Sequence, residues 1–501
     1  MKPLDWRDAA VVLGVSALVF FIGLGTHPFR STEGHRVAPA WAMLETGDVR
    51  TPRLFETVYV RKPLGMPWAI GVSSAAFGQH EFGARVPSAL AGLALAMLSW
   101  AFARVWFGHR WGLAAGLGAA LFPALWPPGR AAEIEMLMIA ATGAAAFGVI
   151  ECCRRGGVWP LICIGLGVFV SGAAKGPAGL PVIAAACAGG VFVLRPRSRH
   201  VLAAMVATGI GLLAALLAIP GDSLGEPVVR QGVGDFLYTP ERLLELPAFG
   251  PMVALTAMPL VLAMLLPWGP DARREGERSQ DAGARHRVAL ALAWAFALAL
   301  VVYTLAGVAN PRYGLPAVVV LPPLVAYAAR GAFSPDEFLV HRARIARWMF
   351  LGARWSWPAV LLGAFIAWVA VAEPRRAETS AFAAAESLAP HLEPGEWVWA
   401  ESQADTRPEL LLYLEQMTGV RAYWAYDEVQ ADPPTLAPAS RPAESPQVEP
   451  PDALILTLPE RDLLVEMFGA EAFREVARVT VRARELVLVR PTRPADTMAA
   501  P

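Results

Sequence analysis

Long apolar segments recur along most of the chain, and they constrain its fold more than any other feature. A helix needs about 20 mostly apolar residues to cross the hydrocarbon core of a bilayer. The composition agrees, because 55% of the 501 residues are hydrophobic and 17% are charged, against about 25% charged in soluble domains. We predict an α-helical polytopic membrane protein with about eleven spans (range 11–13), the first of them an uncleaved N-terminal segment. They lie near residues 9–26, 83–106, 111–128, 134–152, 158–173, 177–194, 200–219, 249–267, 288–308, 313–329 and 355–372.

Lysine and arginine residues in the loops orient these spans, because cytoplasmic loops carry an excess of both. With a cytoplasmic N-terminus, the cytoplasmic loops hold Arg104, Arg110, Arg154, Arg155, Arg195, Arg197 and Arg199, with further groups in 273–287 and 330–354. The opposite loops beyond residue 85 hold fewer: Arg130, Lys175, Arg230, Arg242 and Arg312. We therefore predict a cytoplasmic N-terminus and, after an odd number of spans, an outer C-terminal region.

The segment 31–68 breaks this bias, because it lies outside and yet is rich in ionisable residues. They are Glu33, His35, Arg36, Glu45, Asp48, Arg50, Arg53, Glu56, Arg61 and Lys62. One interpretation is a solvated loop of mixed charge. The other is a site for an anion at the membrane surface, such as a lipid phosphate. Residues 37–47, which end at Gly47, and residues 64–78 favour two short helices along the outer interface.

The C-terminal region has a different character, because no segment after Glu373 is apolar enough to span. The sequences "EWVWAES", "ALILTL" and "ELVLVR" predict strands, and the patterns near 407–418 and 459–475 predict helices. Residues 431–451 are proline-rich and predict a flexible loop. We predict two domains: a transmembrane domain 1–372, including a structured outer loop 27–82, and a small soluble α/β domain 373–501.

Neither a metal nor a nucleic acid is indicated by the sequence. The four cysteines lie in or beside apolar runs without metal-ligand spacing. We expect no tightly bound metal, and a loosely held divalent cation stays open. The zero net charge gives no argument for nucleic acid, and we expect none as a partner.

Five motifs in order along the chain carry a resemblance to a known group of enzymes. They are "TEGHRVAPAWAMLETGDVRTPRL" (32–54) followed by "RKPLGMPW", then "EFGARVPSALAG" (81–92), "AAEIEMLM" (131–138), "AKGPAGL" (174–180) and "PRYGLPAVVVLPPLV" (311–325). Over residues 10–330 the chain resembles the aminoarabinose transferase and protein O-mannosyltransferase group of GT-C glycosyltransferases. The group reads D-E-x-R-Y-A where this chain has Thr32, Glu33, His35 and Arg36, so the usual candidate base, an Asp, is replaced by Thr32.

The resemblance implies an inverting membrane glycosyltransferase with catalytic machinery in the first outer loop. Such enzymes take a hexosyl or pentosyl group from a polyprenyl-phosphate donor. They pass it to a lipid, glycan or protein acceptor at the outer face of the bacterial inner membrane. The implied partners are therefore the lipid-linked sugar, its acceptor and membrane lipids.

Two carboxylates are the candidate catalytic residues, because transfer needs a base for the acceptor hydroxyl and a negative charge near the oxocarbenium-like sugar. Glu33 stands in the group's register, and Glu135 begins a later span at the same outer level. Each has a simpler interpretation. Glu33 suits the start of a helix, and Glu135 suits an ion pair with Arg130.

Cations at the outer ends of spans are the candidate ligands of the donor phosphate. They are Lys62, Arg85, Lys175 and Arg312, together with Tyr313. The resemblance implies that Lys62 contacts the phosphate. The alternatives are a snorkelling Lys62, an Arg85 that pairs with Glu81, and interface anchors at positions 312 and 313.

Two other functions stay open. A transporter or lipid flippase is disfavoured by the absence of related halves and by the position of the ionisable groups at helix ends. A non-catalytic relative that binds lipid-linked sugar is suggested by Thr32.

Overall fold

The computed structural model shows a mostly helical chain that divides into two compact units. It describes residues 6–30, 32–55, 57–59, 62–219, 279–305, 311–332, 356–377, 380–401, 408–425, 451–481 and 484–492. The helical unit comprises Met1–Leu24, Val60–Met66 and Arg85–Ala367. The mixed unit comprises Gly25–Tyr59, Pro67–Ala84 and Trp368–Pro501. The segment predicted as the first outer loop thus falls mainly in the same unit as the C-terminal residues.

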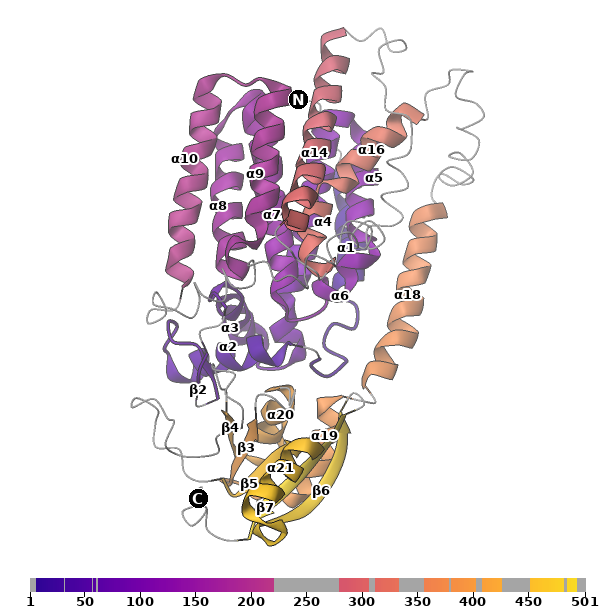
Figure 1. Ribbon diagram of the computed structural model, residues 1–501. Coiled ribbons are helices and arrows are strands. Elements are labelled where there is room, and N and C mark those ends of the chain that lie inside the picture. The colour runs from indigo at the N-terminus through magenta and orange to yellow at the C-terminus, as the bar shows by residue number, and fades with distance from the viewer. Residues whose placement is uncertain are drawn as a thin grey trace. The chain divides into compact units, whose positions relative to one another are not determined.

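The helical unit is built mainly from long apolar helices, several of which adjoin short 3₁₀ or π turns. Figure 1 shows α7, α8, α9, α10 and α14 running side by side, as their mutual contacts confirm. The α-helices are α1 (Trp6–Phe21), α4 (Glu81–Phe107), α5 (His109–Ala120), α6 (Trp126–Gly129), α7 (Ile134–Arg155), α8 (Val158–Lys175), α9 (Leu180–Gly189), α10 (Ser198–Ala215), α14 (Ser279–Leu305), α15 (Leu315–Val318), α16 (Leu321–Ala332) and α18 (Ser356–Ala377). The turns are η1 (Pro123–Leu125), η2 (Gly176–Gly179), η3 (Gly190–Leu194), η4 (Leu216–Ala218) and η6 (Pro311–Gly314).

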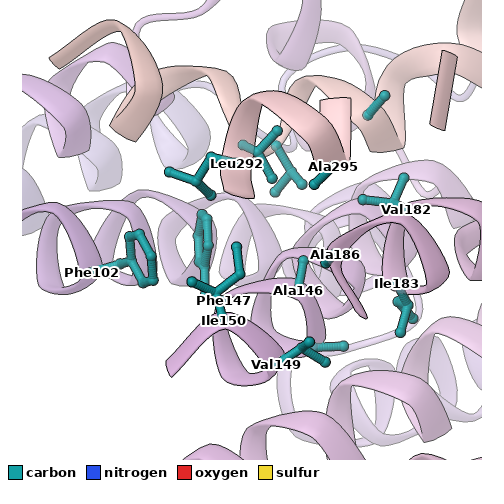
Figure 2. Close-up of a cluster of buried hydrophobic side chains, with 14 of the residues drawn as sticks. Phe102, Ala146, Phe147, Val149, Ile150, Val182, Ile183, Ala186, Leu292 and Ala295 are labelled. Atoms are coloured by element: carbon teal, nitrogen blue, oxygen red, sulfur yellow. The ribbon is translucent and has the colours of Figure 1, made fainter. Parts of the chain in front are cut away.

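The core of this unit lies where α4, α7, α9 and α14 meet. Figure 2 shows Phe102, Phe147, Ile183 and Leu292 in this cluster of buried side chains. The rings of Phe102 and Phe147 stack with their centroids 4.6 Å apart. Small residues let the backbones approach, as is usual for helices packed in a membrane. A Cβ at Gly167, for example, would lie 2.5 Å from the carbonyl oxygen of Ala141.

Five stretches among the described residues are long and apolar enough to cross a membrane. They are Glu81–Phe107, Ile134–Arg155, Val158–Leu194, Ser198–Ala218 and Gly283–Leu305. The third holds two helices, because the chain turns at Gly176 (φ 61°) and both α8 and α9 pack on α7. Two helices thus occupy the positions predicted at 158–173 and 177–194, and that each crosses the membrane stays a prediction. The predicted number of spans stays a prediction.

Four other predicted spans look different in the structure. The helix α1 ends at Phe21, within the span predicted at 9–26. Shorter apolar helices, Leu315–Ala329 and Pro358–Ala370, occupy the positions predicted at 313–329 and 355–372. The segment 111–128 is not one helix, because α5 ends at Ala120 and η1 and α6 follow. The span predicted at 249–267 lies outside the described residues.

The two ends of the helical unit hold different side-chain contacts. At one end, the Arg155 guanidinium lies 4.4 Å from the Trp106 ring centroid, and His109 pairs with Asp8. These residues belong to the termini that face the predicted cytoplasmic loops. The first turn of α7 and the last turn of α8 lie at the opposite end (Figure 1). We call this the Glu135 end. Which end faces the cytoplasm stays a prediction.

The mixed unit combines the first loop with a five-stranded sheet. The strands run in the order β4-β3-β5-β7-β6, with β4, β3 and β5 parallel and β7 antiparallel to β5 and β6. The strands are β1 (Arg53–Leu54), β2 (Thr57–Val58), β3 (Trp397–Glu401), β4 (Arg421–Ala425), β5 (Ala453–Thr457), β6 (Phe473–Val481) and β7 (Arg484–Pro491). The helices are α2 (Gly34–Thr46), α3 (Gly65–Phe77), α19 (Ala381–Leu388), α20 (Pro408–Thr418) and α21 (Leu458–Phe468).

Most elements predicted in this unit are confirmed, with one partial error. The two short helices correspond to α2 and α3, and the three predicted strands are β3, β5 and β7. Gly47 ends α2 in the left-handed conformation (φ 72°). The helix predicted at 459–475 is too long, because Gly469 (φ 89°) ends α21 and β6 begins at Phe473.

Candidate functional site

A buried ion pair joins two of the predicted site residues in the helical unit. Nζ of Lys175, in the last turn of α8, lies 2.8 Å from Oε1 of Glu135, in the first turn of α7. The two side chains are only 7% and 9% exposed. Burying two charges is costly and is repaid only by close geometry. The structure thus brings a candidate base and a candidate phosphate ligand into direct contact.

The turn that follows Lys175 is held by polar contacts with neighbouring helices. The hydroxyl of Tyr303 on α14 donates to the carbonyl oxygen of Ala178 in η2 at 2.7 Å. The hydroxyls of Thr142 and Ser171 lie 3.0 Å apart, and a Cβ at Gly179 would clash with both. These contacts fix the backbone immediately after Lys175.

The segment that carries Lys62 packs at this same end of the helical unit. The amide of Leu64 donates to the carbonyl oxygen of Ala218 at 2.8 Å. A Cβ at Gly65 would lie 2.6 Å from the carbonyl of Ala173, two residues before Lys175. The backbone around Lys62 is therefore anchored to the last turn of α8. The Lys62 side chain is half-buried.

The other predicted cations occupy different environments. Arg85 is 3% exposed and donates from Nη1 to the carbonyl oxygen of Leu24 at 3.0 Å. Arg130 likewise donates to the carbonyl oxygens of Val19 and Ile22. Both guanidiniums bind carbonyls at the end of α1, where cations are favoured. Arg312 is exposed on η6, and the Tyr313 side chain lies outside the described set.

Glu33 lies in the mixed unit and is fully buried. Its Oε2 accepts a hydrogen bond from the Arg30 amide at 2.7 Å. Glu33 takes the position before α2, but its backbone is helical and its carboxylate does not cap that helix. Glu33 therefore stands at the start of the helix, as the simpler interpretation has it, but without a capping hydrogen bond from its side chain. The carboxylate is instead oriented by the backbone of the turn that precedes it.

The residues that depart from the family pattern surround Glu33 in sequence. Arg36 is 7% exposed, and its Nη1 donates to the Tyr59 hydroxyl at 3.3 Å. The His35 ring centroid lies 5.9 Å from that of Tyr59. Thr32 is half-buried in the turn before α2. These contacts tie the first turn of α2 to the strand end that precedes Lys62.

The "TGD" part of the first motif has a structural role. Oδ1 of Asp48 accepts from the amides of Arg50 and Thr51 at 2.9 and 3.1 Å, which forms a turn. The Arg50 amide is the largest cause that lowers the pKa of Asp48 below its ordinary value. The indole of Trp68 donates to the carbonyl oxygen of Val49 at 2.7 Å and ties this turn to α3.

The described residues contain no group of three or more His, Cys, Asp or Glu side chains placed to hold a metal ion. Sequence reasoning missed the pairing of Glu135 with Lys175, because the two lie 40 residues apart. It also missed Tyr413, whose hydroxyl accepts a hydrogen bond from the Phe29 amide of the first loop.

The sequence is similar to known glycosyltransferases over part of its length. Residues 61–221 match the family described as dolichyl-phosphate-mannose-protein mannosyltransferase. The undecaprenyl phosphate-alpha-4-amino-4-deoxy-L-arabinose arabinosyl transferase of Pseudomonas savastanoi pv. phaseolicola is 29% identical over 114 residues, 22% of this chain and 21% of the relative. Transferase 2 of the same description from Pseudomonas fluorescens is 32% identical over 98 residues, 19% of this chain and 18% of the relative. The matches span about a fifth of these relatives.

The fold is similar to solved structures over the whole chain. The crystal structure of ArnT from Cupriavidus metallidurans in the apo state has a TM-score of 0.69 at 17% identity. The structure of the same protein bound to undecaprenyl phosphate has a TM-score of 0.64 at 18% identity. Each comparison covers 100% of both chains. The chain therefore resembles the GT-C membrane glycosyltransferases, in sequence over residues 61–221 and in fold over its whole length.

Proposed function

We propose that this chain is an inverting membrane glycosyltransferase that uses a polyprenyl-phosphate sugar as donor. The acceptor is a lipid, glycan or protein at the outer face of the bacterial inner membrane, and the transferred group is a hexosyl or pentosyl sugar. The buried contact between Glu135 and Lys175 carries the proposal. It places a carboxylate and a cation together at helix ends, within the residues that match the mannosyltransferase family.

The fold comparison supports the choice of donor. The similar ArnT chain was crystallised with undecaprenyl phosphate, which is a polyprenyl phosphate. The residues that match the family include Lys62, Arg85, Glu135 and Lys175. We assign the donor phosphate to Lys62 and Lys175 first, because their backbones are anchored together through Gly65 and Ala173. Arg85, Arg312 and Tyr313 are further candidate ligands.

The ion pair suggests how donor binding prepares the site. A donor phosphate offers Lys175 a second anionic partner in a setting of low dielectric, where charge-assisted hydrogen bonds are strong. As Lys175 turns toward the phosphate, the Glu135 carboxylate becomes available for the acceptor hydroxyl or for the positive charge developing on the sugar.

The reaction itself is a single displacement. The acceptor oxygen bonds to the anomeric carbon while the bond from that carbon to the phosphate oxygen breaks, and the polyprenyl phosphate leaves. The acceptor proton passes to a carboxylate. We propose Glu33 as this base, from its register in the first motif, and Glu135 as the second catalytic carboxylate.

Binding and turnover of purified protein in proteoliposomes test the proposal. We expect Lys62→Ala to weaken the binding of undecaprenyl phosphate while the protein stays folded in the membrane. The matched control is Arg154→Ala, which removes an exposed cation from the opposite end of the helical unit. Unchanged affinity in Lys62→Ala would leave Lys62 as a snorkelling residue.

A second experiment identifies the sugar and its acceptor. Mass analysis of envelope lipids and glycans from a deletion strain should reveal a species that lacks one sugar. Donor binding without transfer to any fraction would favour the non-catalytic alternative that Thr32 suggests. Transbilayer movement of the donor without transfer would favour a flippase.

A further inference from the structure

Tyr413 joins two segments that are far apart in the sequence. Its hydroxyl oxygen accepts a hydrogen bond from the Phe29 amide at 2.5 Å and donates to Oε1 of Glu81 at 2.7 Å. All three residues belong to the mixed unit. Tyr413 is 3% exposed, and its ring stacks on Phe29 (5.9 Å, 25°) and meets the edge of Phe382 (5.1 Å, 89°).

The Phe29 amide is next to the one that orients Glu33. The Arg30 amide donates to Oε2 of Glu33, and the Glu33 amide donates back to the Arg30 carbonyl oxygen at 3.2 Å. Consecutive amides of one turn are thus held by Tyr413 and by Glu33. A shift of the peptide before Phe29 would therefore move the hydrogen bond that orients the Glu33 carboxylate.

The start of helix α20 packs against the same turn. A Cβ at Gly34 would lie 2.7 Å from the amide nitrogen of Glu409 and 3.0 Å from the carbonyl carbon of Pro408. Glu409 is 1% exposed. The first residue of α2 therefore lies against the first turn of α20, and Tyr413 is one turn further along that helix. Two independent contacts connect α20 to the backbone around Glu33.

We propose that Tyr413 is a positioning residue for Glu33, acting through the amides of Phe29 and Arg30. Glu81 strengthens the effect, because a hydroxyl that donates to a carboxylate becomes a better acceptor. This inference rests on the proposed function, since it assigns a role within that reaction. It makes the α/β part of the chain a determinant of turnover.

Tyr413→Phe tests the role, because the ring is kept and only the hydroxyl is lost. We expect kcat to fall by about 10- to 100-fold, the order of loss that follows small displacements of catalytic groups. The Kd for undecaprenyl phosphate should stay within about twofold. Tyr423→Phe is the matched control, since Tyr423 lies on β4 of the same unit with its ring against Trp399. Equal kcat values in the two variants would overturn the inference.

A double-mutant cycle separates positioning from a general loss of structure. If Tyr413 acts through Glu33, Tyr413→Phe should cost little further activity in a Glu33→Gln background. Equal losses in both backgrounds would show that Tyr413 does not act through Glu33. If Tyr413→Phe does not fold, Glu81→Gln replaces it, because this variant weakens the polarisation of the hydroxyl and leaves Tyr413 in place. A wild-type kcat in Glu81→Gln would then overturn the inference.

The outcomes also separate this inference from the proposed function. A wild-type protein that transfers no sugar from any polyprenyl-phosphate donor refutes the proposed function, and the inference falls with it. An active wild type with a fully active Tyr413→Phe refutes the inference alone.

Discussion

Gly65 packs against the backbone of Ala173 so closely that no side chain fits between them. A Cβ on Gly65 would lie 2.6 Å from both the carbonyl carbon and the carbonyl oxygen of Ala173. Lys62 precedes this contact by three residues and Lys175 follows it by two. The contact therefore holds the backbone segment that carries Lys62 against the segment that carries Lys175. The relative position of these two segments depends on Gly65 and Ala173 and not on the lysines themselves.

Gly65→Ala should weaken donor binding by displacing the Lys62 segment from α8. Overpacking typically costs about 1–3 kcal/mol, so we also expect a lower Tm for the purified protein. Gly71→Ala is the control in the same helix, because its Cβ would meet the Ala40 carbonyl oxygen at an ordinary 3.7 Å. Equal donor affinity in the two variants would show that the close approach does not position Lys62.

Lys175→Met should destabilise the protein more than the double variant Glu135→Leu, Lys175→Met, in which both buried charges are replaced by apolar side chains. Removing one partner of a buried ion pair costs roughly 3–5 kcal/mol, whereas replacing both partners often costs little. Thermal unfolding in detergent measures the difference. If the single and double variants had the same Tm, the 2.8 Å contact would not contribute to the fold.

Glu33→Gln should lower turnover by about 10²- to 10⁴-fold with the donor still bound, as expected for the loss of a positioned base. Glu45→Gln changes an exposed glutamate of α2, the helix that follows Glu33, and should stay active. Near-full activity in Glu33→Gln, combined with loss in Glu135→Gln, would transfer the role of base to Glu135.

The mixed unit should lose stability in acid through Glu396. Hydrogen bonds from Arg490 (2.7 and 2.9 Å) hold the pKa of Glu396 below its ordinary value, although partial burial acts to raise it. This stabilisation is present above the unfolded pKa of about 4.3 and is lost as pH falls through the folded pKa.

Arg490→Met should make the free energy of unfolding fall less steeply as the pH is lowered. The reason is that the pKa of Glu396 would then differ less between the folded and unfolded states. Urea unfolding of the purified protein between pH 7 and pH 3 checks the slope. Glu466→Gln, at an exposed position of α21, should leave it unchanged. An identical pH slope in wild type and Arg490→Met would remove Glu396 from the explanation.

The predicted topology is tested by a reporter that is active only in the cytoplasm, fused after Arg490. The fusion should be silent, because the arginine-rich loops and an odd number of spans place the C-terminal region outside. A fusion after Arg155 should be active. Strong activity after Arg490 would reverse the orientation.

Local sequence patterns predicted the elements whose ends are marked by glycine or by a change of periodicity. Gly47 ends α2 as expected, and β3, β5 and β7 coincide with the apolar segments that predicted strands. The strand β6 was missed, because it lies at the edge of the sheet. Its sequence, "FREVARVTV", alternates charged and apolar residues too irregularly to be distinguished from the preceding helix.

The candidate site was less predictable, because its contacts depend on how helices pack. The positions of Glu135 and Lys175 at helix ends followed from the spans, but the only partner considered for Glu135, in its simpler interpretation, was Arg130. In the structure, Arg130 binds carbonyls at the end of α1, and Lys175 contacts Glu135. Nothing in the sequence near Tyr413 indicates that its hydroxyl binds the Phe29 amide.

The hydrogen bond between Phe29 and Tyr413 spans 384 residues, which has a consequence for synthesis. At translation rates of about 5–20 residues per second, the ribosome needs roughly 20–80 s to reach Tyr413 after Phe29. During that interval the turn before Glu33 lacks the partner that holds it, even when the early helices are already inserted. A nascent chain that has not reached α20 therefore has its first loop without that bond, and the loop acquires it only late in translation.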